Sequence, residues 1–464
     1  MRIKPILQNI LLIAVSALLL VSCHDKEKKS DESSIEEACR FISEVMYQYY
    51  YWLKDLPETD YTKESDPMAY FEKLRSKDDP FSYVSDKAQE DLASMDGDSK
   101  DKGWEYSFLS LDNNMYDIVA VVNYVHKNTP AYAAGVRRGD CIIMVGNEKL
   151  NRDNYGTLFR SSSAVYKGYR YNKANGGLDP IEFEITDSQN TKNAVSEYAI
   201  FDGNIGYLLY TQYTTAFNSD LDRVAEEFKA AGVKNVILDL RYNLGGYNDA
   251  MRYLCSILAP KSAVDNEDII IWFEFNENLS RLNSYKKENN ADRFTKSVKT
   301  NLDLEKVVFI VGDYTYSSSE ATVIGLQPYM DTYKIGRQTG GKNYTMMVFT
   351  PEDFVDRRGR AYFDSSINNW LLVPIVAKYR NSADYTFVSE QGIAPDYEMN
   401  ELDYDDMGEL GSPDEPLTAA AIEYIKTGSI TPRGNKSATL RGSRELKDNT
   451  KRGYMIKRFS LNEQ

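Results

Sequence analysis

The chain contains few residues of the types that build metal centres and histidine-based active sites. Its 464 residues include only two histidines, His24 and His126, and four cysteines. The cysteines lie far apart and show no CxxC or other zinc-ligand spacing, so the sequence predicts no metal site and no disulfide framework. A serine nucleophile in this chain would need a base other than histidine, and lysine is the obvious substitute.

Basic charge is scarce relative to acidic charge. The formal net charge is −15, which argues against a general nucleic-acid binder because phosphates attract basic surfaces. Hydrophobic residues make up 42% of the chain and aromatic residues 12%, which is enough for packed cores. A chain of this length is expected to contain two or three domains. No pattern calls for a cofactor.

Long apolar runs are confined to the beginning of the chain. A basic start precedes an apolar run over residues 6–20, followed by Val21-Ser22-Cys23. This pattern predicts a signal peptide over residues 1–22 and resembles a bacterial lipobox, in which Cys23 carries a lipid that anchors the protein to a membrane. Ordinary secretion with an incidental Cys23 is the alternative. Residues 23–34, rich in Lys, Asp, Glu and Ser, are predicted to be a lipidated, flexible tether.

Residues 35–95 are predicted to form an N-terminal helical domain. Apolar residues recur at helical spacing from Ile35 to Met46. A second helix is expected to begin at Asp66-Pro67.

Residues 100–195 show a different pattern. A β-type run over residues 118–122 is followed by a short helix from Pro130 to Gly135, a Gly139-Asp140 turn and an apolar strand over residues 141–145. This order resembles a bacterial PDZ module, which binds peptide C-termini by adding the peptide as a strand. The resemblance implies a polypeptide partner held through its C-terminus, with the carboxylate loop near residues 103–108. A small αβ domain without a peptide groove is the alternative.

Strand and helix patterns alternate over residues 200–428, which places this segment in the α/β class. Two buried strands, over residues 233–240 and 307–311, each lead into a helix. Residues 429–464 are polar and rich in Lys and Arg, and they are predicted to form a poorly ordered basic tail.

Candidate chemistry is concentrated where these two strands end. The Gly245-Gly246 turn either exposes a backbone N–H that stabilises an oxyanion or uses its glycines only to turn sharply. Ser317 begins the second helix, where its hydroxyl would lie at the carboxyl edge of the sheet. Ser317-x-x-Glu320 also fits a capping box, and one hydroxyl cannot be both cap acceptor and free nucleophile.

Lys342 follows Ser317 by 25 residues, in a Gly340-Gly341-Lys342 loop. As a base it would need burial to bring its pKa toward neutrality, because a solvated lysine stays protonated. A solvated loop lysine is the alternative.

Three motifs together resemble those of the carboxyl-terminal processing peptidases, a serine–lysine protease family with a PDZ domain. They are Asp239-Leu240-Arg241-Tyr242-Asn243-Leu244-Gly245-Gly246, Thr315-Tyr316-Ser317-Ser318-Ser319-Glu320 and Gly336-Arg337-Gln338-Thr339-Gly340-Gly341-Lys342. The resemblance implies a crotonase- or ClpP-like α/β core of stacked ββα units. It also implies Ser317 as nucleophile, Lys342 as general base, and an oxyanion hole from the N–H of Ser318 and that of Gly245 or Gly246.

The segments over residues 49–52, 79–82 and 392–396 resemble the lipoprotein branch of this family found in Bacteroides-like bacteria. One position departs from the family pattern. Many members carry a glutamine four residues after the lysine, where this chain has Met346, which offers no comparable hydrogen bond. Asn343 is a candidate substitute.

The resemblance therefore predicts an exported lipoprotein of the bacterial cell envelope, periplasmic or attached to the outer membrane. Its expected activity is that of a serine endopeptidase that cleaves unfolded or C-terminally presented proteins through an acyl-enzyme. A catalytically silent, peptide-binding PDZ lipoprotein is the alternative, and Met346 favours it. A lipase-like hydrolase is disfavoured because Ser317 lies in no G-x-S-x-G motif. The sequence makes no prediction of oligomeric state.

Overall fold

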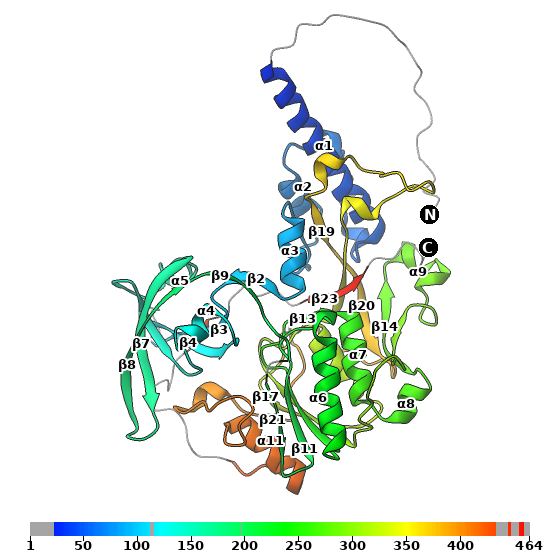
Figure 1. Cartoon of the computed structure of the whole chain (residues 1–464). Helices are drawn as coiled ribbons and strands as arrows, with labels where there is room; N and C mark the ends of the chain where they lie inside the picture. The colour runs from blue at the N-terminus through cyan, green and yellow to red at the C-terminus, as the bar shows by residue number, and fades with distance from the viewer. Residues whose placement is uncertain (1–22, 112–115, 196, 433–443, 447–453, 459–464) are drawn as a thin grey trace, which may run out of the picture.

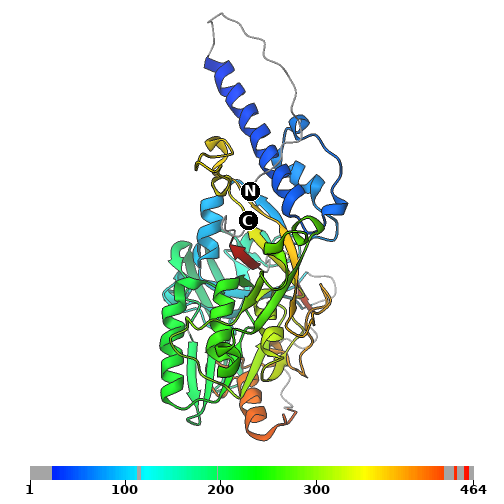
Figure 2. The same cartoon turned by 90° about the vertical axis from the view of Figure 1, so that its right-hand side faces the viewer.

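The structure is a computed structural model that describes residues 23–111, 116–195, 197–432, 444–446 and 454–458 (Figures 1 and 2). The predicted signal peptide over residues 1–22 lies outside the described residues. Within the described ranges, no helix combines the length and apolar character that a membrane span requires.

The N-terminal segment is mainly helical and packs on one end of the molecule (Figure 1). Its elements are α1 (Cys23–Tyr49), the 3₁₀ helices η1 (Leu53–Asp55) and η2 (Tyr61–Lys63), α2 (Pro67–Leu74), β1 (Tyr83–Ser85) and α3 (Ala88–Met95). The Asp66 carboxylate accepts hydrogen bonds from the N–H groups of Met68 and Ala69 and so caps α2. The helix predicted to begin at Asp66-Pro67 is therefore confirmed.

The prediction of a flexible tether over residues 23–34 is wrong, because α1 already begins at Cys23. The segment is rich in Glu and Lys, which are good helix formers, and it extends the helix that begins the N-terminal domain. Both views show this end of α1 projecting away from the rest of the protein (Figures 1 and 2).

The PDZ-like unit is built on a seven-stranded sheet with the order β22-β3-β4-β5-β7-β8, in which β6 also pairs with β5. Its elements are β2 (Asp98–Asp101), β3 (Trp104–Ser110), β4 (Ile118–Val125), α4 (Pro130–Ala133), β5 (Cys141–Val145), β6 (Glu148–Lys149), α5 (Tyr155–Phe159), β7 (Ser163–Asn172), β8 (Gly177–Thr186) and β9 (Ser188–Thr191). The predicted order of strand, short helix, turn and strand is confirmed in β4, α4 and β5.

The remaining α/β core contains two six-stranded sheets. Their orders are β10-β11-β12-β16-β17-β21 and β13-β23-β18-β20-β14-β15. The first half of the core consists of β10 (Glu197–Phe201), β11 (Ile205–Leu209), η3 (Thr215–Phe217), α6 (Asn218–Ala230), β12 (Asn235–Asp239), β13 (Gly245–Tyr247), α7 (Asn248–Leu258), α8 (Lys261–Asp265), β14 (Ile269–Phe275), α9 (Glu277–Ser280), η4 (Asn283–Tyr285) and β15 (Ala291–Arg293).

The second half carries the remaining motifs. It consists of β16 (Lys306–Val311), α10 (Ser318–Leu326), β17 (Asp331–Gly336), β18 (Tyr344–Val348), η5 (Pro351–Asp353), η6 (Ser365–Ile367), β19 (Leu371–Val373), β20 (Ile375–Asn381), β21 (Tyr397–Glu398), η7 (Glu401–Asp403) and α11 (Pro416–Thr427). Helix α11 ends at Gly428, which adopts the left-handed conformation with φ of 72°.

The first sheet is buried on both faces, as its apolar strands predict. Val236 and Leu238 of β12 belong to the main core with α6, α7 and α10, whereas Ile237 points into a second core that includes α11. Strands β11, β12, β16 and β17 pair in parallel, so their carboxyl ends meet at one edge. The predicted α/β class is confirmed, and the turns after β12 and β16 leave the sheet side by side.

Part of the C-terminal tail is ordered, contrary to the prediction of a poorly ordered segment over residues 429–464. Strand β22 (Arg444–Leu446) pairs with β3, and β23 (Tyr454–Arg458) lies between β13 and β18. The edges of β3, β13 and β18 offer backbone hydrogen-bonding groups that a strand can satisfy. Ile456 also supplies an apolar side chain that becomes 1% exposed.

Candidate active site

Ser317 lies at the junction between β16 and α10 in a conformation that is rare for a side-chain-bearing residue. Its φ is 62° and its ψ is −110°, so the backbone is strained. The Ser317 hydroxyl is buried and has no hydrogen-bond partner among the described residues. Buried hydroxyls are normally paired, so an unpaired one at a strained position indicates a functional role.

Ser317 and Glu320 have the arrangement of a capping box at the start of α10, but only its carboxylate half is hydrogen-bonded. Glu320 Oε2 accepts from the Ser317 N–H at 2.7 Å, whereas the Ser317 hydroxyl accepts no hydrogen bond from any described residue. Both interpretations of the Ser317-x-x-Glu320 motif therefore hold in part. The motif caps the helix through Glu320 and leaves the Ser317 hydroxyl available.

Lys342 is completely buried, which contradicts the interpretation of a solvated loop lysine. Its Nζ contacts Met346 Sδ at 2.8 Å and lies 4.7 Å from the centre of the Phe81 ring. The i, i+4 spacing brings the Met346 thioether against the amine, but a thioether is a weaker acceptor than the amide oxygen of a glutamine.

Asn343 does not take the place of the family's glutamine. Its side-chain amide donates to Phe387 O at 2.6 Å, and its Oδ1 accepts from the Ser389 hydroxyl. These bonds hold Asn343 against the segment that follows β20, so its role is to fix the loop around Lys342.

Two buried side chains join the backbones of Ser317 and Lys342. Glu320 Oε2 accepts from the N–H of Lys342 at 2.9 Å, in addition to that of Ser317. On the other side, the Tyr379 hydroxyl lies 3.0 Å from Ser317 O and 2.8 Å from Lys342 O. Because neither bridging side chain is exposed, the serine and lysine segments are held as one unit.

The Glu320 carboxylate has four hydrogen-bond donors around it. Besides Ser317 and Lys342, it accepts from the N–H of Gly341 at 2.8 Å and from the Thr339 hydroxyl. Burial raises the pKa of the Glu320 carboxyl, although these hydrogen bonds oppose the rise. Glu320 thus positions the whole lysine loop relative to the start of α10.

The glycines of the lysine loop allow this close packing. A Cβ on Gly340 would lie 2.1 Å from the Tyr316 ring, and a Cβ on Gly341, whose φ is 90°, would lie 2.8 Å from the backbone of Glu390. Larger residues would push the loop away from Ser317.

The Gly245-Gly246 turn lies against the beginning of α10. This agrees with the prediction that the candidate residues at the ends of the two buried strands lie at one edge of the sheet. The Ser318 hydroxyl donates to Gly246 O at 2.8 Å, and the Ser319 hydroxyl donates to Asn243 O at 2.9 Å. The Gly245 N–H already donates to Asn243 Oδ1 at 2.8 Å. The structure therefore brings together Ser317, Ser318 and the two glycines, and it engages the Gly245 N–H within the turn.

A cavity of about 440 Å³ opens next to this turn, between the PDZ-like unit and the core. Leu244 and Gly245 line it on the core side, and Glu105 and His126 line it on the PDZ-like side. The cavity therefore lies between the PDZ-like unit and the turn that precedes α7.

His126 is buried, and burial lowers the pKa of its imidazole. It packs on the Tyr124 ring at 4.8 Å, with its Nε2 3.7 Å from Glu105. Burial also raises the pKa of the Cys39 thiol to about 11 and that of the Cys141 thiol to about 12, which disfavours their reactive thiolate forms. Among the described residues, no cluster of His, Cys, Asp or Glu is arranged to hold a metal ion.

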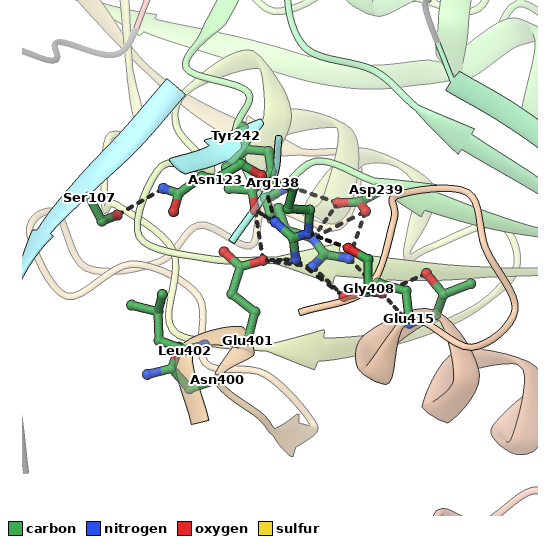
Figure 3. A network of polar contacts seen from close by, with 12 residues as sticks. Ser107, Asn123, Arg138, Asp239, Tyr242, Asn400, Glu401, Leu402, Gly408 and Glu415 are labelled. Carbon is green, nitrogen blue, oxygen red and sulfur yellow. Dashed lines mark hydrogen bonds and ion pairs between the residues drawn. The ribbon is translucent and has the colours of Figure 1, made fainter. Parts of the chain in front are cut away.

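A buried charge network joins the PDZ-like unit to the same turn (Figure 3). Arg138, which follows α4, contacts Glu401 at 2.6 Å and the Tyr242 hydroxyl. Arg241 contacts Glu401 and Glu415, each at 2.8 Å. Since Tyr242 directly precedes Asn243-Leu244-Gly245-Gly246, the network fixes the turn relative to the PDZ-like unit.

Sequence reasoning missed several residues that build the site. Glu320 was identified only as part of the capping box, and its hydrogen bonds to the N–H groups of Gly341 and Lys342 were not predicted. Tyr379, Phe81 and Arg138 gave no comparable signal, because each reaches the site from a separate element through the fold.

The fold and the site together define a peptidase of the serine class with an attached PDZ module. Three family models match the chain: "Peptidase family S41" over residues 204–399, "Peptidase S41 N-terminal domain" over residues 37–83 and "PDZ domain" over residues 121–162. Two of these models, over residues 37–83 and 204–399, describe peptidase family S41, so these parts of the chain are similar to an S41 peptidase.

Known proteins agree with this assignment. The chain is similar to two proteins named "Probable CtpA-like serine protease" from two strains of Staphylococcus epidermidis, each 21% identical over 60% of this chain. It spans 50% of the length of these relatives. A crystal structure of a candidate S41 protease from Bacteroides fragilis is 25% identical, with a TM-score of 0.66 over 84% of this chain and 97% of that one.

Proposed function

We propose that this chain is an endopeptidase in which Ser317 attacks a peptide carbonyl carbon while Lys342 accepts the hydroxyl proton. Lys342 returns the proton to the leaving amine, and water then hydrolyses the acyl-enzyme by the reverse proton path. The observation that carries the proposal is the buried, unpaired Ser317 hydroxyl in a strained backbone that Glu320 and Tyr379 tie to Lys342.

The oxyanion that forms during the attack needs backbone donors at the same place. The N–H of Ser318 at the start of α10 is assigned to it, together with one N–H of the Gly245-Gly246 turn. The contact between the Ser318 hydroxyl and Gly246 O supports this assignment because it holds the two segments together.

The substrate class follows from the route to the site. Ser317 is buried, and the cavity of about 440 Å³ beside Gly245 adjoins the PDZ-like unit, which supports a substrate that enters as an extended chain. We therefore assign unfolded or C-terminally presented polypeptides as substrates, with the PDZ-like unit holding the C-terminal side.

Cleavage of an unfolded protein tests the mechanism. The parent, Ser317→Ala and Lys342→Ala are purified without residues 1–22, with Ser366→Ala and Lys261→Ala as matched controls on exposed positions. We expect the two site variants to lose about 10³-fold or more in kcat/KM and the controls to keep the parent rate. Equal rates in all five proteins would contradict the mechanism.

A silent peptide-binding lipoprotein gives a different result in the same experiment. The parent would then bind a labelled unfolded chain without cleaving it, and Ser317→Ala would bind equally well. The observation that favours this alternative is the contact of Lys342 with Met346, which stands where many family members have a glutamine.

The cell envelope is proposed as the location because of the predicted signal peptide and lipidated Cys23. Expression of the full chain and of Cys23→Ala in a bacterial host tests this proposal by membrane fractionation. The parent is expected in the membrane fraction and the variant in the soluble fraction. An identical distribution would contradict lipid anchoring at Cys23.

A further inference from the structure

The two ordered pieces of the C-terminal tail lie on the two surfaces that a polypeptide substrate would use. Strand β22 pairs antiparallel with β3 at the edge of the PDZ-like sheet, with Leu446 opposite Phe108. Strand β23 is inserted between β13 and β18 and runs parallel to both (Figure 1). A peptide that binds a PDZ edge or a protease cleft as an added strand needs these same backbone groups.

The register of β23 places it directly at the proposed catalytic groups. Gly245 lies opposite Tyr454 and Gly246 lies opposite Met455. On the other side, Met346 lies opposite Ile456, and Met346 is the residue that contacts Lys342 Nζ. Strand β23 therefore lies between the Gly245-Gly246 turn, which is the proposed oxyanion site, and β18, which carries Met346 beside the proposed base Lys342.

Side chains hold the tail in this place. Ile456 is 1% exposed and belongs to an apolar cluster with Tyr247, Met346 and the strands β19 and β20. Leu446 packs against the apolar core of the PDZ-like unit. Glu445 forms an ion pair with Arg337, which lies in the loop leading to Lys342.

We propose that the segments Arg444–Leu446 and Tyr454–Arg458 act as an internal pseudosubstrate that occupies the PDZ edge and the catalytic cleft. A substrate must displace them, so the tail lowers the activity of the intact chain. This inference rests on the proposed function of Ser317 and Lys342 and deepens it in one respect. It assigns to substrates an extended backbone with an aliphatic side chain in the pocket that Ile456 fills.

Activity measurements on three forms of the protein test the regulatory role. The parent is compared with Ile456→Asp and with a chain that ends at Thr431, and Ser429→Asp serves as the control for added charge on an exposed position. Displacing the tail removes a competing conformation, so both altered tails are expected to raise kcat/KM about tenfold. Parent-like kcat/KM in both would overturn the proposal. Ile456→Asp decides the outcome if the shortened chain does not fold by circular dichroism.

Peptide binding separates this proposal from the proposed function. A labelled peptide with the sequence of residues 444–458 is titrated into the shortened chain carrying Ser317→Ala, and fluorescence anisotropy is measured. Saturable binding that is lost when the peptide carries Ile456→Asp supports the pseudosubstrate, even where no variant cleaves protein. Absence of binding to the folded protein overturns it.

The third test asks whether the parent protein cleaves its own C-terminal tail. The intact mass of the purified parent is compared with that of Ser317→Ala after incubation. A tail that stays uncut in both supports a persistent occupant. A tail that is removed in the parent and kept in Ser317→Ala overturns the pseudosubstrate role, because the tail is then a substrate.

Discussion

The molecule buries polar groups in two neighbouring regions, which differ in how well these groups are paired. The charge network around Arg138 and Arg241 pairs two arginines with three carboxylates, those of Asp239, Glu401 and Glu415. The region around Ser317 and Lys342 leaves a buried hydroxyl without a partner among the residues that the structure describes. It also sets a buried amine against a thioether and an aromatic ring.

This difference separates a structural role from a chemical one. In the network, charge pairing outweighs the cost of burial: burial opposes ionisation of Glu401, but the charges of Arg138 and Arg241 lower the pKa of its carboxyl to about 2. At the site, the strained Ser317 backbone and its hydroxyl, which has no partner among the described residues, cost free energy, and the proposed nucleophile role accounts for this cost. Tyr242 and the turn that follows it connect the two regions.

Loss of Arg241 is expected to have the largest effect. Arg241→Ala leaves the buried carboxylates of Asp239 and Glu415 facing each other, which should lower the free energy of unfolding by about 3–5 kcal/mol. Arg223→Ala is the control, because Arg223 is 45% exposed and its partners, Asp220, Glu227 and Tyr198, lie at the surface or are partly exposed, so its loss should cost less than about 1 kcal/mol. Urea unfolding measures both. Equal losses of unfolding free energy in the two variants would contradict a structural role for the buried charge network.

The second largest expected effect is a loss of stability of the buried charge network at low pH. Because the pKa of Glu401 is lowered from 4.5 to about 2, its contribution to stability is fully present above pH 4.5 and is lost as the pH falls toward 2. The contribution corresponds to about 3 kcal/mol at most. Unfolding free energies of the parent and of Glu401→Gln between pH 6 and pH 2.5 should converge as the pH falls. A constant difference across that range would contradict the pairing.

Substitution of Glu320 should affect rate more than binding. In Glu320→Gln the amide nitrogen cannot accept hydrogen bonds, so part of the set of donors on Ser317, Thr339, Gly341 and Lys342 loses its acceptor. We expect kcat to fall about 10- to 100-fold, with KM within about twofold of the parent value.

Glu226→Gln on the surface of α6 serves as the control for Glu320→Gln. Two outcomes would show that Glu320 is only a helix cap. One is a KM that rises by as large a factor as kcat falls, and the other is a loss of rate explained entirely by unfolding at the assay temperature.

Met346 should give the smallest effect. Met346→Gln places a stronger acceptor beside Lys342 Nζ and should raise kcat about threefold, in line with one improved hydrogen bond. Met346→Leu keeps the volume, removes the acceptor and should lower kcat by a similar factor. Identical rates in the three proteins would show that the thioether contact does not orient the lysine.

The sequence predicted the parts of the site that depend on local patterns. The strand-to-helix turns at Gly245-Gly246 and at Ser317, the lysine loop and the order of elements in the PDZ-like unit were visible because each occupies a short stretch with its own spacing. Their meeting at one sheet edge followed from parallel strands, and the Ser318 contact to Gly246 confirms it.

Long-range contacts escaped prediction. The Tyr379 hydroxyl reaches Ser317 and Lys342 from β20, and no pattern in the sequence around Tyr379 marks it. The tail was expected to lack order because its composition is polar, yet strand pairing depends on backbone groups, and Ile456 supplies a buried side chain. The orientation of Lys342 was also missed, because it depends on which atom of Met346 packs against the amine.

The most direct test of the central claim is acylation of the intact chain by a small serine-reactive ester, followed by peptide mass spectrometry. One adduct on Ser317 is predicted, with labelling that is strongly reduced in Lys342→Ala although the serine is still present. An adduct on another serine, or equal labelling of Ser317 in the parent and in Lys342→Ala, would contradict a serine activated by this lysine.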